Sequence, residues 1–383
     1  MSQLPPLSLY IHIPWCVQKC PYCDFNSHGQ KSELPEQAYV NRLVDDLTAD
    51  LEWVQGRPIH TIFIGGGTPS LFSAAAIAGL ITRIRERVHL TDDCEITMEA
   101  NPGTFEVERF AGFVAAGITR LSLGVQSLQN EQLTALGRIH DSAQAITATN
   151  YAKQLLLQSY NVDLMHGLPG QSVELALEDL RQIIALDPPH ISWYQLTIEP
   201  NTQFASRPPT LPDDDVLWDI YQRGHALLEA AGYQQYEVSA YAKAGHQARH
   251  NRNYWTFGDY LGIGCGAHSK ITQKDAANGT LTLTRCEKIK HPQGYLDITK
   301  PLRYRQWQVP LEERLFEYFM NRLRLHEPIP HAEFEARTGL ATAAAEQALS
   351  RAYAQGLVTA NAQSWETTPT GRQFLNSILD ELV

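Results

Sequence analysis

The sequence predicts an α/β fold: a partial barrel of six strand–helix units, followed by a smaller C-terminal α+β module. In the first half of the chain, short β-branched runs alternate with longer amphipathic stretches, the pattern of parallel strands joined by helices. Six such units are too few to close an eight-stranded barrel, so the sheet should stay open and curved. From about residue 311 the pattern changes to short helices and a hairpin.

Six apolar runs of the first half are predicted strands: Leu7–Ile13, Thr61–Ile64, Glu95–Met98, Ile118–Leu123, Asn161–Met165 and Ile191–Leu196. The helical patterns between them are Glu36–Val54, Ala74–Val88, Val107–Ala116, Ala143–Gln158 and Val173–Leu186. A doubly wound sheet is the alternative. Its glycine-rich fingerprint would follow the first strand, where this chain has Pro14-Trp15-Cys16.

The rest of the chain is predicted to form an extension of the barrel and a separate module. After a loop rich in Pro and Asp, a helix at 216–231 and strands at 236–240 and 280–284 should extend the first domain and cover its open side. Helices at 312–325, 331–338 and 342–355, a hairpin of 357–360 and 365–367, and a helix at 371–382 resemble a winged helix. The predicted domains are residues 1–235, 236–305 and 306–383.

The composition is that of an acidic globular protein. Its 383 residues include 31 Lys+Arg and 42 Asp+Glu, a net charge of −11, which argues against a general nucleic-acid binder. The winged-helix-like module is acidic as well, so a DNA-binding regulator that carries a metal cluster is a less favoured alternative. No apolar run approaches the ~20 residues of a membrane span, and the N-terminus does not resemble a secretory signal. We therefore expect a cytoplasmic location.

Three of the six cysteines lie within eight positions, in Cys16-Val-Gln-Lys-Cys20-Pro-Tyr-Cys23. Thiolates suit iron–sulfur clusters or zinc. Structural zinc sites take four ligands, commonly from two cysteine pairs; a second pair is missing here, although His12 or His28 could complete such a site. A cubane cluster normally takes four cysteines, so three would leave one iron open to a substrate. The spacing favours a [4Fe–4S] cluster over zinc or packed thiols.

Glycines and polar residues follow the other predicted strands. Gly65-Gly66-Gly67-Thr68 follows the second strand, where bare backbone could approach a ligand closely, and Glu99, Gln126 and Asp163 follow the next three. Active sites of βα barrels gather at the carboxyl ends of the strands. Together with the cysteine loop after the first strand, these positions predict one shared pocket.

The C-x3-C-x2-C spacing is the signature of the radical S-adenosylmethionine superfamily, whose fold is a partial (β/α)6 radical-SAM barrel. At family level, the chain resembles the anaerobic coproporphyrinogen dehydrogenase (HemN-like) family over nearly its whole length. The matching stretches are Tyr10-Ile-His-Ile-Pro, Gly65-Gly-Gly-Thr-Pro, Glu99-Ala-Asn-Pro, Gly124-Val-Gln-Ser, Leu136-Gly-Arg and Asp163-Leu-Met-His-Gly-Leu-Pro-Gly. The resemblance implies a [4Fe–4S] cluster on Cys16, Cys20 and Cys23, whose open iron chelates S-adenosylmethionine for reductive cleavage to a 5′-deoxyadenosyl radical.

Carried over position by position, the resemblance places nine residues at the S-adenosylmethionine site: Tyr10, Tyr22, Gly66, Gly67, Thr68, Glu99, Gln126, Arg138 and Asp163. Gly66, Gly67 and Glu99 suit the ammonium group of the cofactor. Arg138 suits its carboxylate as a charge-assisted pair. Gln126 and Asp163 suit the ribose hydroxyls.

Two departures separate the chain from the dehydrogenases. They carry a further cysteine two positions after the third, where this chain has Phe25, and an N-terminal extension before the cysteines. Both departures match the branch of heme chaperones called HemW, and His250-Asn-Arg-Asn-Tyr254-Trp255 resembles the HNxxYW motif of that branch. The motif implies that His250 ligates heme or positions Tyr254 and Trp255 against it. On chemical grounds alone, a histidine beside aromatic residues is more often structural.

The resemblance therefore implies a heme chaperone that carries a [4Fe–4S] cluster, S-adenosylmethionine and heme, and passes heme to unidentified acceptor proteins. An electron donor such as flavodoxin or ferredoxin, and peripheral contact with membrane-bound acceptors, are compatible with this interpretation. Nucleic acid is not an expected partner. The alternative function is that of an oxygen-independent coproporphyrinogen III dehydrogenase, which Phe25 argues against.

Overall fold

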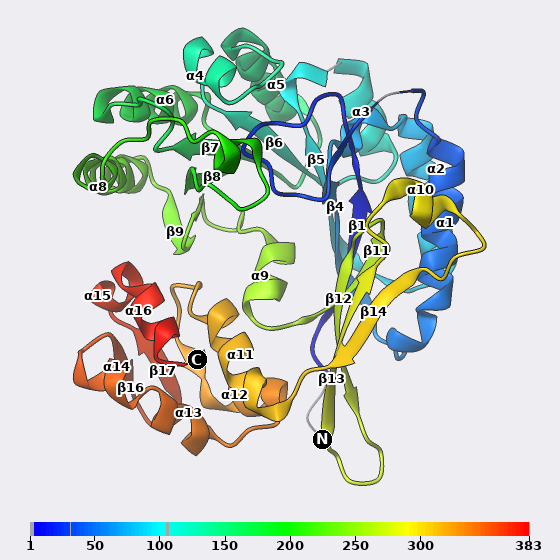
Figure 1. The fold of residues 1–383 in the computed structure, drawn as a ribbon, viewed down its shortest axis with the longest axis vertical. Helices are drawn as coiled ribbons and strands as arrows, with labels where there is room; N and C mark the ends of the chain where they lie inside the picture. The colour runs from blue at the N-terminus through cyan, green and yellow to red at the C-terminus, as the bar shows by residue number, and fades with distance from the viewer. Residues whose placement is uncertain (1–3, 31, 105–106, 383) are drawn as a thin grey trace.

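The structure is a computed structural model that describes residues 4–30, 32–104 and 107–382. It confirms the predicted fold class. Among the described residues, a twelve-stranded sheet has six parallel strands at its centre, which lie side by side in chain order (Figure 1). They are β1 (Leu7–Ile13), β4 (Ile59–Gly66), β5 (Leu90–Ala100), β6 (Arg120–Gln126), β7 (Ser159–His166) and β8 (His190–Gln195).

Helices form an arc outside these strands and cover the outer face of the central sheet (Figure 1). They are α1 (Glu36–Ala49), α2 (Ala74–Arg85), α3 (Val107–Ala115), α4 (Asn130–Ala135), α5 (Ser142–Gln154), α6 (Val173–Leu186) and α8 (Asp214–Ala230). Short side chains cap their N-termini: Asp141 forms a capping box with Gln144, and Ser172 and Asp213 accept from the first turns of α6 and α8.

The segment after β8 extends the sheet at both of its edges. At one edge, β10 (Ala240–Ala242) pairs with β8 and β9 (Gln234–Glu237) with β10, so the predicted boundary at residue 235 falls within β9. At the other edge, β11 (Asp259–Gly264) pairs in parallel with β1. The next strands each pair antiparallel with the strand before: β12 (His268–Lys274), β13 (Leu281–Lys288) and β14 (Arg303–Gln308). Helix α9 (Arg249–Trp255) connects the two edges.

A buried charge network fixes the extension to the barrel. The ammonium group of Lys288 on β13 donates to Asp46 and, at 2.6 Å, to Asp50, and all three side chains are fully buried. Asp46 belongs to α1 and Asp50 follows it, so the network joins the two segments. A buried charge set of this kind is stable only when every member is paired.

The C-terminal module has its own core and lies beside α9 (Figure 1). Its elements are α11 (Arg314–Arg322), β15 (Ile329–Pro330), α12 (His331–Thr338), α13 (Thr342–Ala348), α14 (Ser350–Ala354), β16 (Val358–Ala360), β17 (Ser364–Thr367), α15 (Pro369–Gln373) and α16 (Leu375–Asp380). Trp365 is fully buried against Phe319 and Phe334. In the part of the chain that is described, no helix is long and apolar enough to cross a membrane.

Candidate functional site

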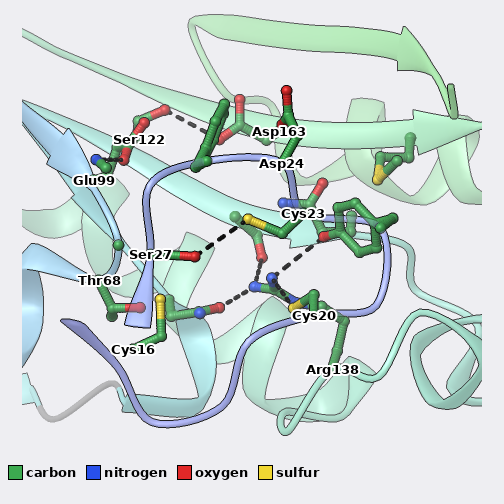
Figure 2. A pocket seen from close by; sticks show the side chains of 18 of the residues that line it. Cys16, Cys20, Cys23, Asp24, Ser27, Thr68, Glu99, Ser122, Arg138 and Asp163 are labelled. Atoms are coloured by element: carbon green, nitrogen blue, oxygen red, sulfur yellow. Dashed lines mark hydrogen bonds between the residues drawn. The ribbon is translucent and has the colours of Figure 1, made fainter. Parts of the chain in front are cut away.

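The three clustered cysteines lie on a loop that is closed at its base. The short strands β2 (Trp15–Cys16) and β3 (His28–Gly29) pair, and the backbone N–H of His28 donates to the Pro14 carbonyl at 2.7 Å. All three thiols line one cavity of about 360 Å³ above the strand ends (Figure 2). The other cysteines, Cys94, Cys265 and Cys286, are buried elsewhere.

The glycine run after β4 is required by the close approach of the cysteine loop. The N–H groups of Gly67 and Thr68 donate to the carbonyls of Ile13 and Trp15, each at 2.7 Å. A Cβ at position 67 would lie 2.5 Å from the Trp15 carbonyl oxygen, and Gly66 has a φ of +110°, which side chains rarely adopt. The bare backbone therefore holds the cysteine loop in place in addition to lining the cavity.

Two carboxyl groups, Glu99 and Asp163, line the same cavity. Glu99 accepts a hydrogen bond from the Gly66 N–H at 3.0 Å, and Asp163 accepts from Asn161 at 2.7 Å and from Ser122 at 3.2 Å. Burial, with a smaller contribution from the charge of Asp163, raises the pKa of Glu99 to about 7, and burial also raises the pKa of Asp163. Two half-buried carboxyl groups for which no ion pair is found among the described side chains fit a cationic ligand.

Arg138 lies on the opposite side of the cavity, where it connects the cysteine loop to the end of β6. Its guanidinium lies 3.4 Å from the Cys20 sulfur and 3.4 Å from the Tyr22 hydroxyl, and donates to the Gly124 carbonyl at 2.9 Å and to Asn101 (Figure 2). Its Nε is buried without a hydrogen-bond partner. This cation is placed to neutralise a thiolate and to pair with a ligand carboxylate.

Gln126 follows a bulge in β6 and has a φ of +71°, a left-handed conformation that costs a non-glycine residue of the order of 1–3 kcal/mol. Its side-chain oxygen accepts a hydrogen bond from the Tyr194 hydroxyl at 2.8 Å, and both residues line the cavity. Tyr194 was not predicted from the sequence. Its position at the end of β8, the sixth strand, was the signal that could have found it.

The structure gathers most of the predicted site residues around this first cavity: Cys16, Cys20, Tyr22, Cys23, Gly66, Gly67, Thr68, Glu99, Gln126, Arg138 and Asp163. Tyr10 is placed differently. It lines a second, neighbouring cavity of about 830 Å³, and its hydroxyl lies 2.9 Å from Nδ1 of His12.

The HNxxYW stretch forms α9, and two of its aromatic residues, Tyr254 and Trp255, line the second cavity. His250 is 1% exposed. Its Nδ1 lies 2.9 Å from the Thr61 hydroxyl and its Nε2 lies 2.9 Å from the Tyr254 hydroxyl. To ligate iron, His250 would have to give up one of these hydrogen bonds.

The donor set in the first cavity suits a cluster. No three His, Cys, Asp or Glu side chains within the described ranges converge closely enough to hold a single metal ion. A cubane binds each thiolate to a different iron atom, so its ligands surround the cluster and do not meet at one point. His12, a possible fourth zinc ligand on sequence grounds, has both ring nitrogens engaged, by Tyr10 and by the Asn26 carbonyl.

Comparisons with known proteins agree with this geometry. Residues 10–183 match the radical SAM superfamily, and residues 309–374 match the HemN C-terminal domain. The chain is 58% identical to a heme chaperone HemW of Haemophilus influenzae, over 99% of this chain and 98% of that protein. It is 56% identical to a heme chaperone HemW of Escherichia coli, over 99% of both chains. Among solved structures, it resembles the coproporphyrinogen III oxidase HemN of Escherichia coli with a TM-score of 0.83, at 24% identity over 99% of this chain and 90% of that one.

Proposed function

Since the chain belongs to the HemW family of the radical SAM superfamily, we propose that it is a heme chaperone, which binds heme and passes it to acceptor proteins. The observation that carries this proposal is the full-length identity to curated heme chaperones. The likeness to the oxidase supports the fold alone. It does not extend to that enzyme's reaction, because the identity is too low.

Membership of this family implies a [4Fe–4S] cluster and S-adenosylmethionine, and suitable residues for both line the first cavity. The thiols of Cys16, Cys20 and Cys23 would hold the cluster, which supplies an electron to the bound cofactor. Glu99 and Asp163 are half-buried acids of the cavity lining that suit the positive charges of S-adenosylmethionine. Arg138, beside Cys20, suits its carboxylate. We propose that S-adenosylmethionine binds among the predicted site residues that line the first cavity. Tyr10 would border this site from the second, neighbouring cavity.

The proposal also covers the location of the protein and its partners. All six cysteines are free, which suits a reducing compartment such as the cytoplasm. A flavodoxin or ferredoxin would supply electrons to the cluster. Acceptors of heme would include membrane-bound proteins reached by peripheral contact, and the acidic C-terminal module supports a protein partner over nucleic acid.

The alternative function, oxidative decarboxylation of coproporphyrinogen III, is tested directly. Phe25 occupies the position of the dehydrogenases' further cysteine, and its side chain is 58% exposed beside both cavities. We expect the reconstituted protein, incubated without oxygen with coproporphyrinogen III, S-adenosylmethionine and a reductant, to yield no decarboxylated product by chromatography. Formation of protoporphyrinogen would replace the chaperone proposal with the enzymatic one.

A variant of His250 distinguishes the two roles that the motif allows. Because both ring nitrogens are hydrogen bonded in a buried site, we expect His250→Ala to act through the Tyr254 wall of the second cavity. Losing that hydrogen bond should weaken heme binding by roughly two- to tenfold and leave the axial ligation unchanged. The measurement is a heme titration with the Soret spectrum recorded. Loss of a histidine-ligated spectrum in this variant would instead make His250 the ligand.

A further inference from the structure

The hydroxyl of Ser27 lies beside one of the three thiols of the cysteine loop. Its Oγ is 3.6 Å from the Sγ of Cys23, a hydrogen-bonding distance for sulfur (Figure 2). Ser27 is 5% exposed and lies on the lining of both cavities, so it belongs to the wall between them. It is neither a thiol ligand of the cluster nor one of the residues that suit S-adenosylmethionine.

The chain on either side of Ser27 is fixed, and this holds its hydroxyl in place. The next residue, His28, begins β3, which pairs with β2 at the base of the loop. The residue before, Asn26, donates from its side-chain amide to the carbonyls of Cys265 and Lys290, at 3.0 and 2.9 Å. The end of the cysteine loop is therefore tied to its own base and to the segments that follow β11 and β13.

Two thiols of the first cavity each have one side-chain donor. Arg138 lies 3.4 Å from the Cys20 sulfur, and Ser27 has the corresponding place beside Cys23 (Figure 2). The guanidinium of Arg138 has further partners and suits a ligand carboxylate as well. The hydroxyl of Ser27 differs, because no oxygen or nitrogen atom among the described residues competes with sulfur for it.

The direction of this hydrogen bond follows from the chemistry of a cluster ligand. A thiolate has no proton to donate, so beside an iron-bound Cys23 the hydroxyl of Ser27 is the donor. Reduction by an external reductant adds one electron, and therefore one negative charge, to a cluster and its thiolates. A donor directed at one of these sulfurs stabilises the reduced form more than the oxidised form, and this raises the reduction potential.

We propose that Ser27 is a positioning residue of the cluster: its hydroxyl donates to the Cys23 thiolate, holds this ligand in place and makes the cluster easier to reduce. This inference rests on the proposed [4Fe–4S] cluster and specifies how the chain adjusts it. The electron concerned is the one that the cluster supplies to bound S-adenosylmethionine. Ser27 thus acts on the cofactor's chemistry through Cys23.

Ser27→Ala tests the effect on the reduction potential. The reconstituted protein, without S-adenosylmethionine, is titrated with dithionite and redox mediators, and the reduced cluster is followed by electron paramagnetic resonance. At a fixed potential, the ratio of reduced to oxidised cluster in Ser27→Ala should be about three- to tenfold lower. A tenfold change corresponds to a potential lower by ~59 mV for one electron. Ser27→Thr keeps the hydroxyl and should retain the potential of the unaltered protein.

Ser8→Ala is the matched control. Ser8 is also buried, at 1% exposure, and its hydroxyl also forms a hydrogen bond, with Thr61 at 2.7 Å, but it lies on β1 and off both cavity linings. This variant should keep both the iron content and the potential. A general loosening of the barrel would alter the two alanine variants alike, whereas loss of the hydrogen bond to sulfur alters Ser27→Ala alone.

Isotope exchange identifies the proton of this hydrogen bond. Electron–nuclear double resonance on the reduced cluster should detect, close to the cluster, a proton signal that disappears when the protein is transferred to D₂O. This signal should be missing in Ser27→Ala and present in Ser27→Thr. If the exchangeable protons of Ser27→Ala match those of the unaltered protein, Ser27 is not the donor.

The outcomes separate this inference from the proposal on which it rests. If the unaltered protein assembles no cluster, both fail. If it assembles one and Ser27→Ala is reduced at the same potential, the role of Ser27 is wrong while the cluster stands. If Ser27→Ala assembles no cluster, Ser27→Thr and Ser27→Val decide, because they share a shape and differ in the hydroxyl. A cluster in the threonine variant alone supports the hydrogen bond, and equal results in both contradict it.

Discussion

Replacing Cys16, Cys20 or Cys23 by alanine is expected to abolish the iron–sulfur cluster. After anaerobic reconstitution, the unaltered protein should contain about four iron atoms per chain, and each variant close to none. The physical reason is that the three thiols line one cavity, and one missing thiolate leaves an iron without its protein ligand. Iron and sulfide analysis, together with the broad visible absorbance of the cluster, measures the effect.

The matched controls are Cys94→Ala and Cys286→Ala. Both thiols are buried in the sheet, at 6% and 1% exposure, and lie off the cavity lining. These variants should keep the full iron content. A cluster retained in all three loop variants would mean that other residues hold it.

Glu99→Gln is expected to weaken the binding of S-adenosylmethionine by about ten- to a hundredfold, the cost of about 1.5–3 kcal/mol for a lost charge-assisted contact. The amide keeps the shape of the side chain and can still accept the hydrogen bond from Gly66, so iron content should not change. Isothermal calorimetry on the cluster-containing protein measures the affinity. Glu178→Gln, on the outer helix α6, serves as the control and should bind normally.

The pH dependence of that affinity provides a second signature of Glu99. The pKa of its carboxyl in the free protein is about 7, so at lower pH a proton must leave before the carboxylate can pair with a cation. Affinity should therefore fall as the pH is lowered through 7, approaching a tenfold loss per pH unit well below that value. In Glu99→Gln this dependence should disappear. An unchanged pH profile in the variant would assign the titration to another group.

Much of the barrel was predictable, because its strands are short runs rich in buried apolar residues, alternate with helical stretches and follow one another in chain order. The strand at Leu7–Ile13 has the predicted limits, whereas β5 runs from Leu90 to Ala100, well beyond the predicted Glu95–Met98. β12 and β14 were not predicted. They lie toward the edge of the sheet, and their sequences, His268–Lys274 and Arg303–Gln308, are largely polar, so alternation of apolar residues could not reveal them.

The first cavity was predictable for the same reason, since parallel strands bring their carboxyl ends to one rim. The second cavity was not predictable, because it depends on how β11 and β12 continue the sheet beyond β1. These two strands lie far from β1 in the sequence. The motif around His250 drew attention to that histidine. Its burial and its two hydrogen bonds are visible only in the structure.

The central claim, that this protein binds heme and hands it on, is tested most directly by following heme from the loaded protein to an apo-protein acceptor. The chain is first loaded with heme, passed through a desalting column, and mixed with a heme-free acceptor from the same cell in the presence of excess apomyoglobin as a scavenger. The account predicts that a single heme per chain survives the column and that the Soret spectrum of the acceptor then develops despite the scavenger. Loss of all heme on the column, or transfer to apomyoglobin alone, would contradict it.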